Sequence, residues 1–274
     1  MQDFRGKGVI VTGAASGIGL GIARAFASEG ARIVLADIDQ SALDRAKAQL
    51  KGQGAEAIAV RTDVSDPASV AAAAEAAEKA FGKVHIAVNN AGVSMHGVDI
   101  EHVPLEDCHW AFGVNVFGII HGIKSFLPLI RKHGEGGHIV NTASIAGLRV
   151  WPGLQHAIYA ATKHAALALT QALELDLKDT NIGVSALCPS AVNTRLHESA
   201  SRRPERFGGS FERPADAFLR EFMELGTPPD QVGGYVVDGI REGRFYIMTD
   251  AGSRPGLEEH FERVREGFAR REKD

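Results

Sequence analysis

Short, nearly continuous apolar runs alternate with longer amphipathic stretches along most of this 274-residue chain. Such runs indicate strands that are buried on both faces, as in a parallel sheet covered by helices. The expected strands are Gly8–Thr12, Arg32–Ala36, Ala57–Arg61, Val84–Val88, His138–Thr142, Gly183–Cys188 and Arg244–Met248. The expected helices between them include Gly17–Ser28, Ser41–Lys51, Pro67–Phe81, Leu105–Lys132 and Tyr159–Lys178. This alternation predicts right-handed βαβ units and a doubly wound α/β fold.

No repeat, low-complexity tract or linker divides the sequence, so residues 1–274 are expected to form a single domain. Two segments depart from the alternation. Residues 195–229 lack a strand pattern and have a helical core around Ala215–Leu225, and they are interpreted as a substrate lid or a disordered excursion. The charged segment 257–274 is expected to form a helix that packs on its own domain or on a neighbouring subunit. Its apolar residues recur at helical spacing: Leu257, Phe261, Val264 and Phe268.

Composition excludes several classes of protein. The chain has 34 acidic and 30 basic residues and a net charge of −4, so it lacks the global basic field of a nucleic-acid-binding protein. The longest apolar candidate, Val114–Ile130, contains His121 and Lys124 and falls short of an uninterrupted membrane span of about 20 residues. Cys108 and Cys188 are too few for a disulfide framework, and no signal-peptide core follows the polar start. We expect a cytoplasmic protein with no nucleic-acid or membrane partner.

A glycine-rich turn, Thr12-Gly-Ala-Ala-Ser-Gly-Ile-Gly19, joins the first expected strand to a helix. Unpaired N–H groups at a helix start suit a phosphate, and glycines let the backbone approach it closely. Because the turn contains no literal G-x-G-x-x-G, a tight turn that binds nothing stays open as the alternative.

Asp37 ends the second expected strand, 18 residues beyond Gly19. A carboxylate at this offset would accept a hydrogen bond from a ribose 2′-hydroxyl and would repel the 2′-phosphate of NADP. No Arg or Lys stands among residues 14–16 to offset that repulsion, so the sequence favours NAD as the cofactor over NADP. The alternative is that Asp37 only starts the following turn.

Tyr159 and Lys163 are four residues apart on an expected helix and therefore share a face. An ammonium about 4 Å from the hydroxyl would stabilise the phenolate by roughly 4 kcal/mol at an effective dielectric near 20. This predicts that the pKa of Tyr159 falls from its usual value near 10 toward about 7, where general acid–base catalysis is efficient. The alternative is an exposed Tyr and Lys on an amphipathic helix, which we would favour if Ser144 and Asn115 were absent.

Five ordered motifs resemble those of the short-chain dehydrogenase/reductase family. They are the turn at 12–19, Asn89-Asn-Ala-Gly92, Asn115, Ser144 and Tyr159-Ala-Ala-Thr-Lys163, and the similarity runs from about Lys7 to Thr194. The resemblance implies a Rossmann-type doubly wound fold with a single seven-stranded parallel sheet flanked by helices. It also implies that Tyr159 exchanges a proton with the substrate oxygen and that Ser144 positions that oxygen. Lys163 would hold the nicotinamide ribose, and Asn115 would hold a water that links Lys163 to solvent.

The same resemblance assigns contacts to the cofactor. Asp63 and Val64 would contact the adenine, Asn89 and Gly92 would line the cleft, and Thr194 would hold the carboxamide. The full expected set is Gly13, Ser16, Gly17, Ile18, Gly19, Asp37, Asp63, Val64, Asn89, Ala91, Gly92, Tyr159, Lys163, Pro189, Val192 and Thr194.

The sequence departs from the family in two places. Pro189-Ser190 replaces the usual Pro-Gly, and the charged segment 257–274 replaces the Gly-rich end that builds part of the usual tetramer interface. The dimer interface formed by the helices at 105–132 and 159–178 carries over. We therefore expect a homodimer or a homotetramer.

Several further residues have two interpretations. Arg202, Arg203, Arg206 and Arg213 are interpreted as solvated surface, with recognition of an acidic substrate as the alternative. His156, three residues before Tyr159, is interpreted as a loop histidine with a solvent partner, with a substrate contact as the alternative. The eleven histidines show no zinc-type spacing, so no metal is expected. A hydrophobic or ring-bearing substrate is favoured by the residues around the expected pocket: Val93, Ser94, Met95, Leu148, Trp151, Leu154 and Ala191.

The function expected from these features is an NAD-dependent oxidoreductase that interconverts a secondary alcohol and a ketone by hydride transfer. The alternative is a nicotinamide-binding redox sensor without turnover, against which the complete set Asn115, Ser144, Tyr159 and Lys163 argues. A nucleotide-sugar epimerase also uses a Tyr/Lys pair, but the sequence after Thr194 is too short for its larger substrate domain.

Overall fold

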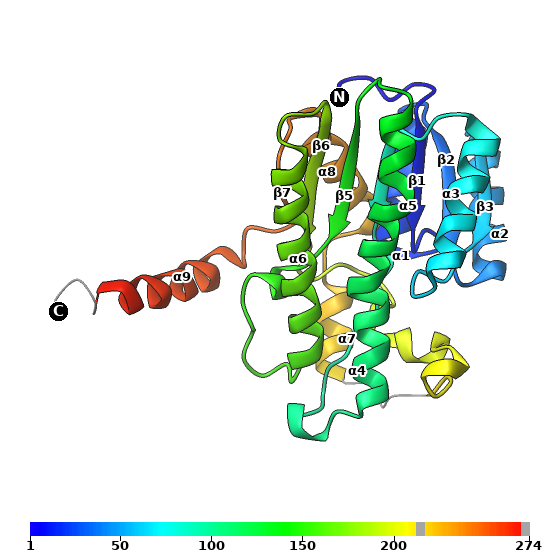
Figure 1. The fold of residues 1–274 in the computed structure, drawn as a ribbon. Coiled ribbons are helices and arrows are strands. Elements are labelled where there is room, and N and C mark those ends of the chain that lie inside the picture. Colours follow the sequence, from blue (N-terminus) through cyan, green and yellow to red (C-terminus); the bar gives the residue numbers. More distant parts are fainter. Residues whose placement is uncertain (212–216, 270–274) are drawn as a thin grey trace.

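The computed structural model describes residues 1–211 and 217–269 and has a seven-stranded parallel sheet at its centre (Figure 1). The strand order is β3-β2-β1-β4-β5-β6-β7, so the chain first builds outwards from β1 and then returns to place β4 on its other side. The strands are β1 Gly8–Thr12, β2 Arg32–Asp37, β3 Ala57–Arg61, β4 Ile86–Asn89, β5 Gly137–Thr142, β6 Ile182–Cys188 and β7 Tyr246–Met248. The expected Rossmann-type fold is confirmed. The reversal between β1 and β4 opens a crevice at the carboxyl ends of the strands, where nucleotides bind in such sheets.

Helices cover both faces of the sheet. Their bounds are α1 Gly17–Ser28, α2 Gln40–Gly52, α3 Pro67–Phe81, α4 Leu105–Phe112, α5 Gly118–Lys132, α6 Ala157–Leu177, α7 Ala217–Glu224, α8 Pro229–Arg241 and α9 Arg254–Ala269. One core cluster joins the sheet to α1, α2 and α8, and a second joins its other face to α3, α5 and α6. Helix α8 is not among the helices expected from the sequence. Pro229 stands at its start, a position that favours proline.

The expected helix at 105–132 is continuous in space but not in hydrogen bonding. A π-helical turn, Gly113–Phe117, separates α4 from α5 and carries Asn115. By length and mean hydropathy, 1.4 in its most apolar window, this helix is apolar enough to cross a membrane, but half of that window is buried inside the domain. Trp110, Ile119 and Phe126 are almost inaccessible to solvent, so the apolar face belongs to the protein core.

Segments near the C-terminus are less regular. The region 195–229 contains two 3-10 turns, Leu196–Arg202 and Glu205–Phe207, followed by α7; the first two positions of the expected core Ala215–Leu225 lie outside the described residues. Helix α9 begins three residues before the expected start and projects away from the body (Figure 1). Within the described residues, the hydrogen bonds that join it to the rest of the chain lie at its beginning, where Arg149 bonds to the Gly256 carbonyl and to Glu259.

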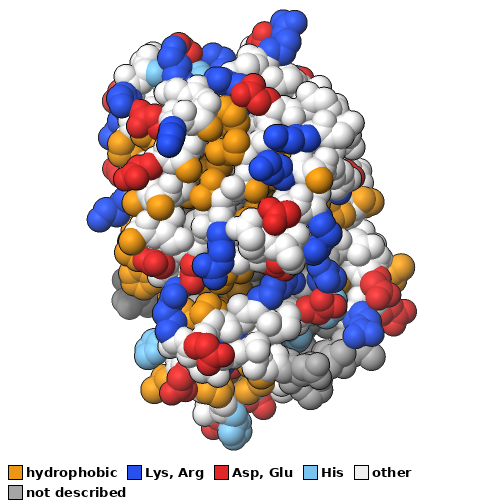
Figure 2. Space-filling model, turned by 90° about the vertical axis from the view of Figure 1, so that its right-hand side faces the viewer, with side chains coloured by type: hydrophobic (Ala, Val, Ile, Leu, Met, Phe, Trp, Pro, Cys, Tyr) orange, Lys and Arg blue, Asp and Glu red, His pale blue; other side chains and the backbone are white. Residues whose placement is uncertain are grey.

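The molecular surface at the β3 edge of the sheet is shown in Figure 2. Blue and red side chains are interspersed on this face and do not gather into a large patch of one sign. Mixed charge of this kind is typical of a solvated surface.

Candidate active site

A cavity lies at the carboxyl ends of the strands and gathers most of the expected site. The expected residues that line it are Gly13, Ser16, Gly17, Ile18, Asp37, Asp63, Val64, Ala91, Gly92, Ser144, Tyr159, Lys163, Pro189, Val192 and Thr194. Residues from distant parts of the sequence therefore meet at one edge of the sheet, because parallel strands all end there.

Two residues of the expected cofactor set are not among those that line this cavity. Gly19 lies beneath the turn, where a Cβ would collide with the carbonyl oxygen of Gly13, so it allows close packing. Asn89 is turned into the domain, where its Nδ2 donates to Asn141 Oδ1 at 2.8 Å. The next residue, Asn90, lines the cavity instead. A strand alternates its side chains between faces, so a shift of one position moves the side chain to the other side.

The glycine turn is shaped to receive a phosphate. Gly13 and Gly17 have φ angles of +65° and +53°, a region that side chains disfavour. A Cβ on Gly13 would lie 2.8 Å from Ala91 Cα. The N-cap of α1, Ser16, makes no side-chain hydrogen bond to the first turn, which leaves the N–H groups there without a capping side chain. Helix starts of this kind bind pyrophosphate, so the residues present fit a nicotinamide dinucleotide.

Thr12 fixes this turn against the end of β4. Its hydroxyl accepts hydrogen bonds from Asn90 N–H at 2.9 Å and Ala91 N–H at 3.0 Å. In return, Asn90 Nδ2 donates to Thr12 O at 2.9 Å. Thr12 and Asn90 each belong to one of the motifs named above, yet neither is among the expected site residues.

Asp37 is held by the backbone of the two neighbouring loops. Its Oδ2 accepts from Ala15 N–H at 3.1 Å, and its Oδ1 accepts from Asp39 N–H at 3.1 Å. The carboxylate is thus fixed beside the glycine turn rather than free in solvent. The cavity also contains a cation, since Arg202 from the region after β6 lines it as well.

Ser144 and Tyr159 face each other across the cavity. Ser144 lies two residues beyond β5, and its hydroxyl donates to Pro189 O at 3.3 Å and accepts from Ala146 N–H at 3.1 Å. A hydrogen bond with Ser144 slightly favours the phenolate of Tyr159, but burial dominates and raises the pKa of Tyr159 to about 12. The expected fall of this pKa toward 7 is therefore wrong for the protein without cofactor.

The position of Lys163 explains that difference. Its Nζ donates to Thr142 O at 2.9 Å and lies 5.7 Å from the centroid of the Tyr159 ring, so the ammonium is not paired with the hydroxyl. Burial also lowers the pKa of Lys163 to about 8, which weakens its charge near neutral pH. Attraction between the two groups alone would lower the pKa of Tyr159, but the cost of removing both groups from water acts in the opposite direction and is larger.

Asn115 connects the π-helical turn to the loop after β4 and to α6. Its Oδ1 accepts from Val93 N–H at 2.8 Å, and its Nδ2 donates to Val93 O and to Thr162 Oγ1, each at 3.0 Å. Both amide hydrogens are thereby used. A water held by this side chain would have to bind the second lone pair of Oδ1.

His156 does not have the expected solvent partner. The residue is only 6% exposed, and neither ring nitrogen has a hydrogen-bond partner among the described residues. Burial lowers its pKa, so the ring is neutral near pH 7. Seven residues were expected around the substrate pocket. Of these, Val93 is among the residues that line the cavity and the other six are not.

Of the four arginines interpreted above as solvated surface, three have roles that such a surface would not give them. Arg203 is buried and forms an ion pair with Asp107. Arg206 Nη2 donates to Asp63 Oδ2 at 2.7 Å, and Arg202 lines the cavity. Arg213 lies outside the described residues.

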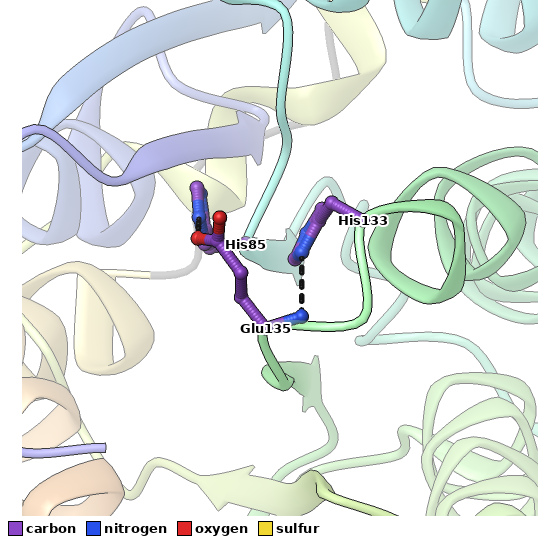
Figure 3. Close-up of side chains that lie close together, drawn as sticks. All are labelled: His85, His133 and Glu135. Carbon is purple, nitrogen blue, oxygen red and sulfur yellow. Dashed lines mark hydrogen bonds and ion pairs between the residues drawn. The ribbon is translucent and has the colours of Figure 1, made fainter.

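A separate cluster of metal-ligand types lies at the amino ends of the strands, away from the cavity (Figure 3). His85 Nδ1 accepts from Gly8 N–H at 3.1 Å, which leaves the Nε2 proton for Glu135 Oε2 at 3.0 Å. His133 Nδ1 accepts from Glu135 N–H at 3.1 Å, and its Nε2 donates to Val84 O at 2.9 Å. Neither ring keeps a lone pair for a metal.

The carboxylate of this cluster is occupied as well. Bonds from Lys83, His85 and Lys7 lower the pKa of Glu135 to about 2. Two ammonium groups beside the carboxylate would repel a cation. We therefore interpret His85, His133 and Glu135 as a structural network that ties the amino ends of β4 and β5 together.

The fold and the cavity define a Rossmann-type enzyme built around a nicotinamide dinucleotide. The model of the short chain dehydrogenase family matches residues 7–205. A short chain dehydrogenase/reductase from Burkholderia phymatum, solved in complex with NAD, is 40% identical with a TM-score of 0.90, covering 97% of this chain and 96% of that one.

Two further proteins are similar over most of their length. The 1-deoxy-11-beta-hydroxypentalenate dehydrogenase of Streptomyces exfoliatus is 34% identical, covering 94% of this chain and 88% of the relative. A short chain dehydrogenase from Burkholderia cenocepacia J2315, solved in complex with NADP, is 27% identical with a TM-score of 0.78, covering 92% of this chain and 100% of that one. This chain belongs to the short-chain dehydrogenase/reductase family and is an oxidoreductase.

Proposed function

We propose that this enzyme uses NAD to interconvert a secondary alcohol and a ketone, with Tyr159 as the residue that exchanges the proton. The observation that carries the proposal is the meeting of Ser144, Tyr159 and Lys163 in one cavity with the phosphate-binding turn. A protein that only bound the dinucleotide would need the turn but would not need a buried hydroxyl pair beside it.

The bound nicotinamide would supply the hydride acceptor or donor, and the remaining chemistry belongs to the side chains. Tyr159 holds a proton on its hydroxyl at neutral pH, because burial keeps its pKa near 12. That proton is placed for delivery to a ketone oxygen as negative charge develops there. Ser144 offers a second hydroxyl to the same oxygen, since it already lies within hydrogen-bonding reach of Tyr159.

Lys163 is the positioning residue beside Tyr159 and Ser144. Its hydrogen bond to Thr142 O fixes the ammonium at the end of β5, 3.5 Å from the place that a Cβ on Gly92 would occupy. From there Lys163 can reach a ribose hydroxyl in the cleft between Gly92 and Tyr159. Asn115 holds the loop after β4 in place through Val93 and so sets the width of that cleft.

The preference for NAD rests on Asp37. Its fixed carboxylate beside Ala15 would accept hydrogen bonds from a ribose and repel a 2′-phosphate. Relatives are known with NAD and with NADP, so the preference is a property to be measured for this chain. Arg202 is the residue that would reduce it, since it lines the same cavity.

The substrate is proposed to be hydrophobic or ring-bearing. Four apolar side chains line the cavity on the side of α4 and α7: Val93, Trp110, Val114 and Met223. We also propose that the described chain works as one catalytic domain in the cytoplasm. Helix α9, which projects with exposed Phe261 and Phe268, supports assembly into a homodimer or homotetramer.

The proposal is tested with purified protein, NAD or NADP, and a panel of aliphatic, aryl and polycyclic secondary alcohols, followed by absorbance of the reduced nicotinamide. We expect turnover with NAD that Tyr159→Phe abolishes while NADH binding persists. Activity retained in Tyr159→Phe would contradict the role of that residue. Tight NADH binding without turnover on any alcohol or ketone would instead favour the redox-sensor alternative.

A further inference from the structure

A 3-10 turn, Ile145–Gly147, connects Ser144 to the loop that leads into α6. Ser144 is the N-cap of this turn, and its Oγ accepts from Ala146 N–H at 3.1 Å. The N–H of Arg149 donates to the Ile145 carbonyl at 3.2 Å, so the backbone of Arg149 is joined to the same turn. The position of the Ser144 hydroxyl therefore depends on where the turn and Arg149 are held.

One side of this turn packs against α6, the helix that carries Tyr159 and Lys163. A Cβ on Gly147 would lie 2.5 Å from the carbonyl oxygen of Lys163, so the lack of a side chain lets the turn approach the helix closely. A displacement of the turn along α6 would change the position of Ser144 relative to Tyr159. These are the two hydroxyls that we place on the substrate oxygen.

The other side of the loop is held by α9. Arg149 Nη1 donates to the Gly256 carbonyl and to Glu259 Oε2, the latter at 3.0 Å. A Cβ on Gly256 would lie 2.7 Å from the Trp151 ring, so the first turn of α9 rests directly on this loop. The Arg149 guanidinium lies 5.0 Å from the centroid of the same ring, a distance at which an aromatic face attracts a cation.

Side-chain hydrogen bonds tie residues 149–155 to their surroundings at two places within the described ranges 1–211 and 217–269. One is the contact of Arg149 with α9, and the other is the bond from Gln155 Nε2 to Asp99 Oδ1 at 3.0 Å. The Gln155 bond lies at the surface, whereas the Arg149 side chain is only 16% exposed. Because a hydrogen bond is stronger where water is excluded, the contact with α9 is the firmer of the two.

We propose that Arg149 is a positioning residue for Ser144 and that the first turns of α9 are its support. The inference rests on the proposed role of Ser144 in the reaction. Ser144 stabilises charge on the substrate oxygen only when its hydroxyl is correctly placed beside Tyr159, and small displacements of such a donor reduce the rate. Helix α9 thus supports the active site of its own chain, in addition to presenting an exposed apolar stripe.

The test compares kcat of the native protein and of Arg149→Ala with NAD and the alcohol that the native protein oxidises fastest. Rates are expressed per NADH-binding site, so that unfolded protein is not counted. We expect kcat to fall about five- to fiftyfold, because a misplaced donor loses part of the roughly 100-fold or more that its removal costs. The KM of the alcohol and the dissociation constant of NADH should change less than about twofold, since Arg149 does not line the cavity.

Two further variants distinguish positioning from general packing. Ser144→Ala already lacks the hydroxyl, so adding Arg149→Ala to it should lower kcat by less than about a further twofold. Glu259→Lys places a like charge opposite Arg149 from a side chain that is 67% exposed. It should therefore lower kcat in the same direction even if Arg149→Ala does not fold.

Arg24→Ala is the matched control, because Arg24 Nη1 pairs with Asp230 Oδ1 at 2.9 Å and joins α1 to α8 with similar exposure of the two side chains. It should keep the native kcat. An unchanged kcat in Arg149→Ala or Glu259→Lys, an equal fall in Arg24→Ala, or a fully additive loss in the double variant would overturn the positioning role. A native protein that binds NADH but turns over no substrate would instead remove the proposed function itself, which distinguishes the two failures.

Discussion

The ammonium of Lys163 lies 5.7 Å from the centroid of the Tyr159 ring and donates to the carbonyl of Thr142, so it stands beside the tyrosine without pairing with its hydroxyl. Burial acts on both groups and drives their pKa values in opposite directions, to about 12 for Tyr159 and about 8 for Lys163. Each shift favours the neutral form. The protein without cofactor therefore holds a protonated tyrosine over a wide range of pH.

This arrangement predicts different pH profiles for the two directions of the reaction. Alcohol oxidation needs the Tyr159 phenolate, so its kcat/KM should rise from pH 7 to above pH 9, by up to about tenfold per unit. Ketone reduction needs the protonated form, which stays fully populated over the same range because the pKa of Tyr159 is about 12, so its kcat/KM should stay level. Tyr159→Phe should lose at least about 100-fold in both directions at every pH. Parallel profiles for the two directions in the native enzyme would contradict this assignment.

Cofactor choice gives a second prediction. Removing the carboxylate in Asp37→Ala deletes the repulsion toward a 2′-phosphate and leaves Arg202 as a charge in the same cavity. We expect the ratio of kcat/KM for NADP over NAD to increase by at least about tenfold. Asp39→Ser is a control, because it removes a neighbouring carboxylate while retaining a residue that caps α2. An equal change in both variants would mean that general charge, not Asp37, sets the preference.

The fold was predictable because strands buried on both faces have a distinctive apolar pattern. Val9-Ile10-Val11 shows it, and the glycine turn that follows marks the crossing into α1. The π-helical turn at 113–117 was not visible in this way, because its residues continue the apolar periodicity of α4 and α5. Helix α8 was not predicted, although Pro229 marks its start and the expected strand Arg244–Met248 follows it.

The residues of the site that belong to sequence motifs were predictable. The properties of the site that depend on packing were not. Tyr159 and Lys163 meet in the expected cavity, but their pKa values depend on burial, which a pair of residues in a sequence does not reveal. Arg203 and Arg206 have the composition of a solvated surface and gain their roles from Asp107 and Asp63, residues about 100 and 140 positions away. No local pattern encodes such partners.

Arg203 and Arg206 should differ in their effect on stability. Arg203→Ala leaves Asp107 buried without this partner, and we expect the free energy of unfolding to fall by about 3–5 kcal/mol. Arg206→Ala breaks a partly exposed pair and should cost less than about 1 kcal/mol. Urea unfolding followed by circular dichroism measures both. Similar losses in the two variants would contradict the role assigned to the difference in burial between the two ion pairs.

Because His138 is buried, we expect the protein to lose stability in mild acid. Burial lowers its pKa from 6.5 to about 3, and its Nε2 lies 2.8 Å from Ser185 Oγ, which itself donates to Arg244 O. Since the unfolded chain takes up the proton first, the free energy of unfolding should fall as pH drops below 6.5 and continue to fall toward pH 3. One proton contributes a slope of up to about 1.4 kcal/mol per pH unit.

Urea unfolding between pH 7 and pH 4 checks that slope. His138→Gln should show a shallower dependence than the native protein, whatever its stability at pH 7. His102, whose side chain is 70% exposed, provides the control His102→Gln, which should retain the native slope. If His138→Gln and the native protein gave parallel curves, another group would be responsible for the acid sensitivity.

Helix α9 yields the last prediction. Along its exposed length it carries Phe261, Val264 and Phe268, at 45%, 48% and 69% exposure, and its hydrogen bonds to the other described residues lie in its first turns. A 16-residue helix without packing is marginal in water, so the apolar face should be covered by a second copy of the chain. Phe261→Glu with Val264→Glu should therefore reduce the mass measured by light scattering, whereas Arg263→Glu, on an exposed position between them, should not. A native protein that is monomeric at micromolar concentration would contradict this, because the stripe would then have no partner to explain why it is apolar.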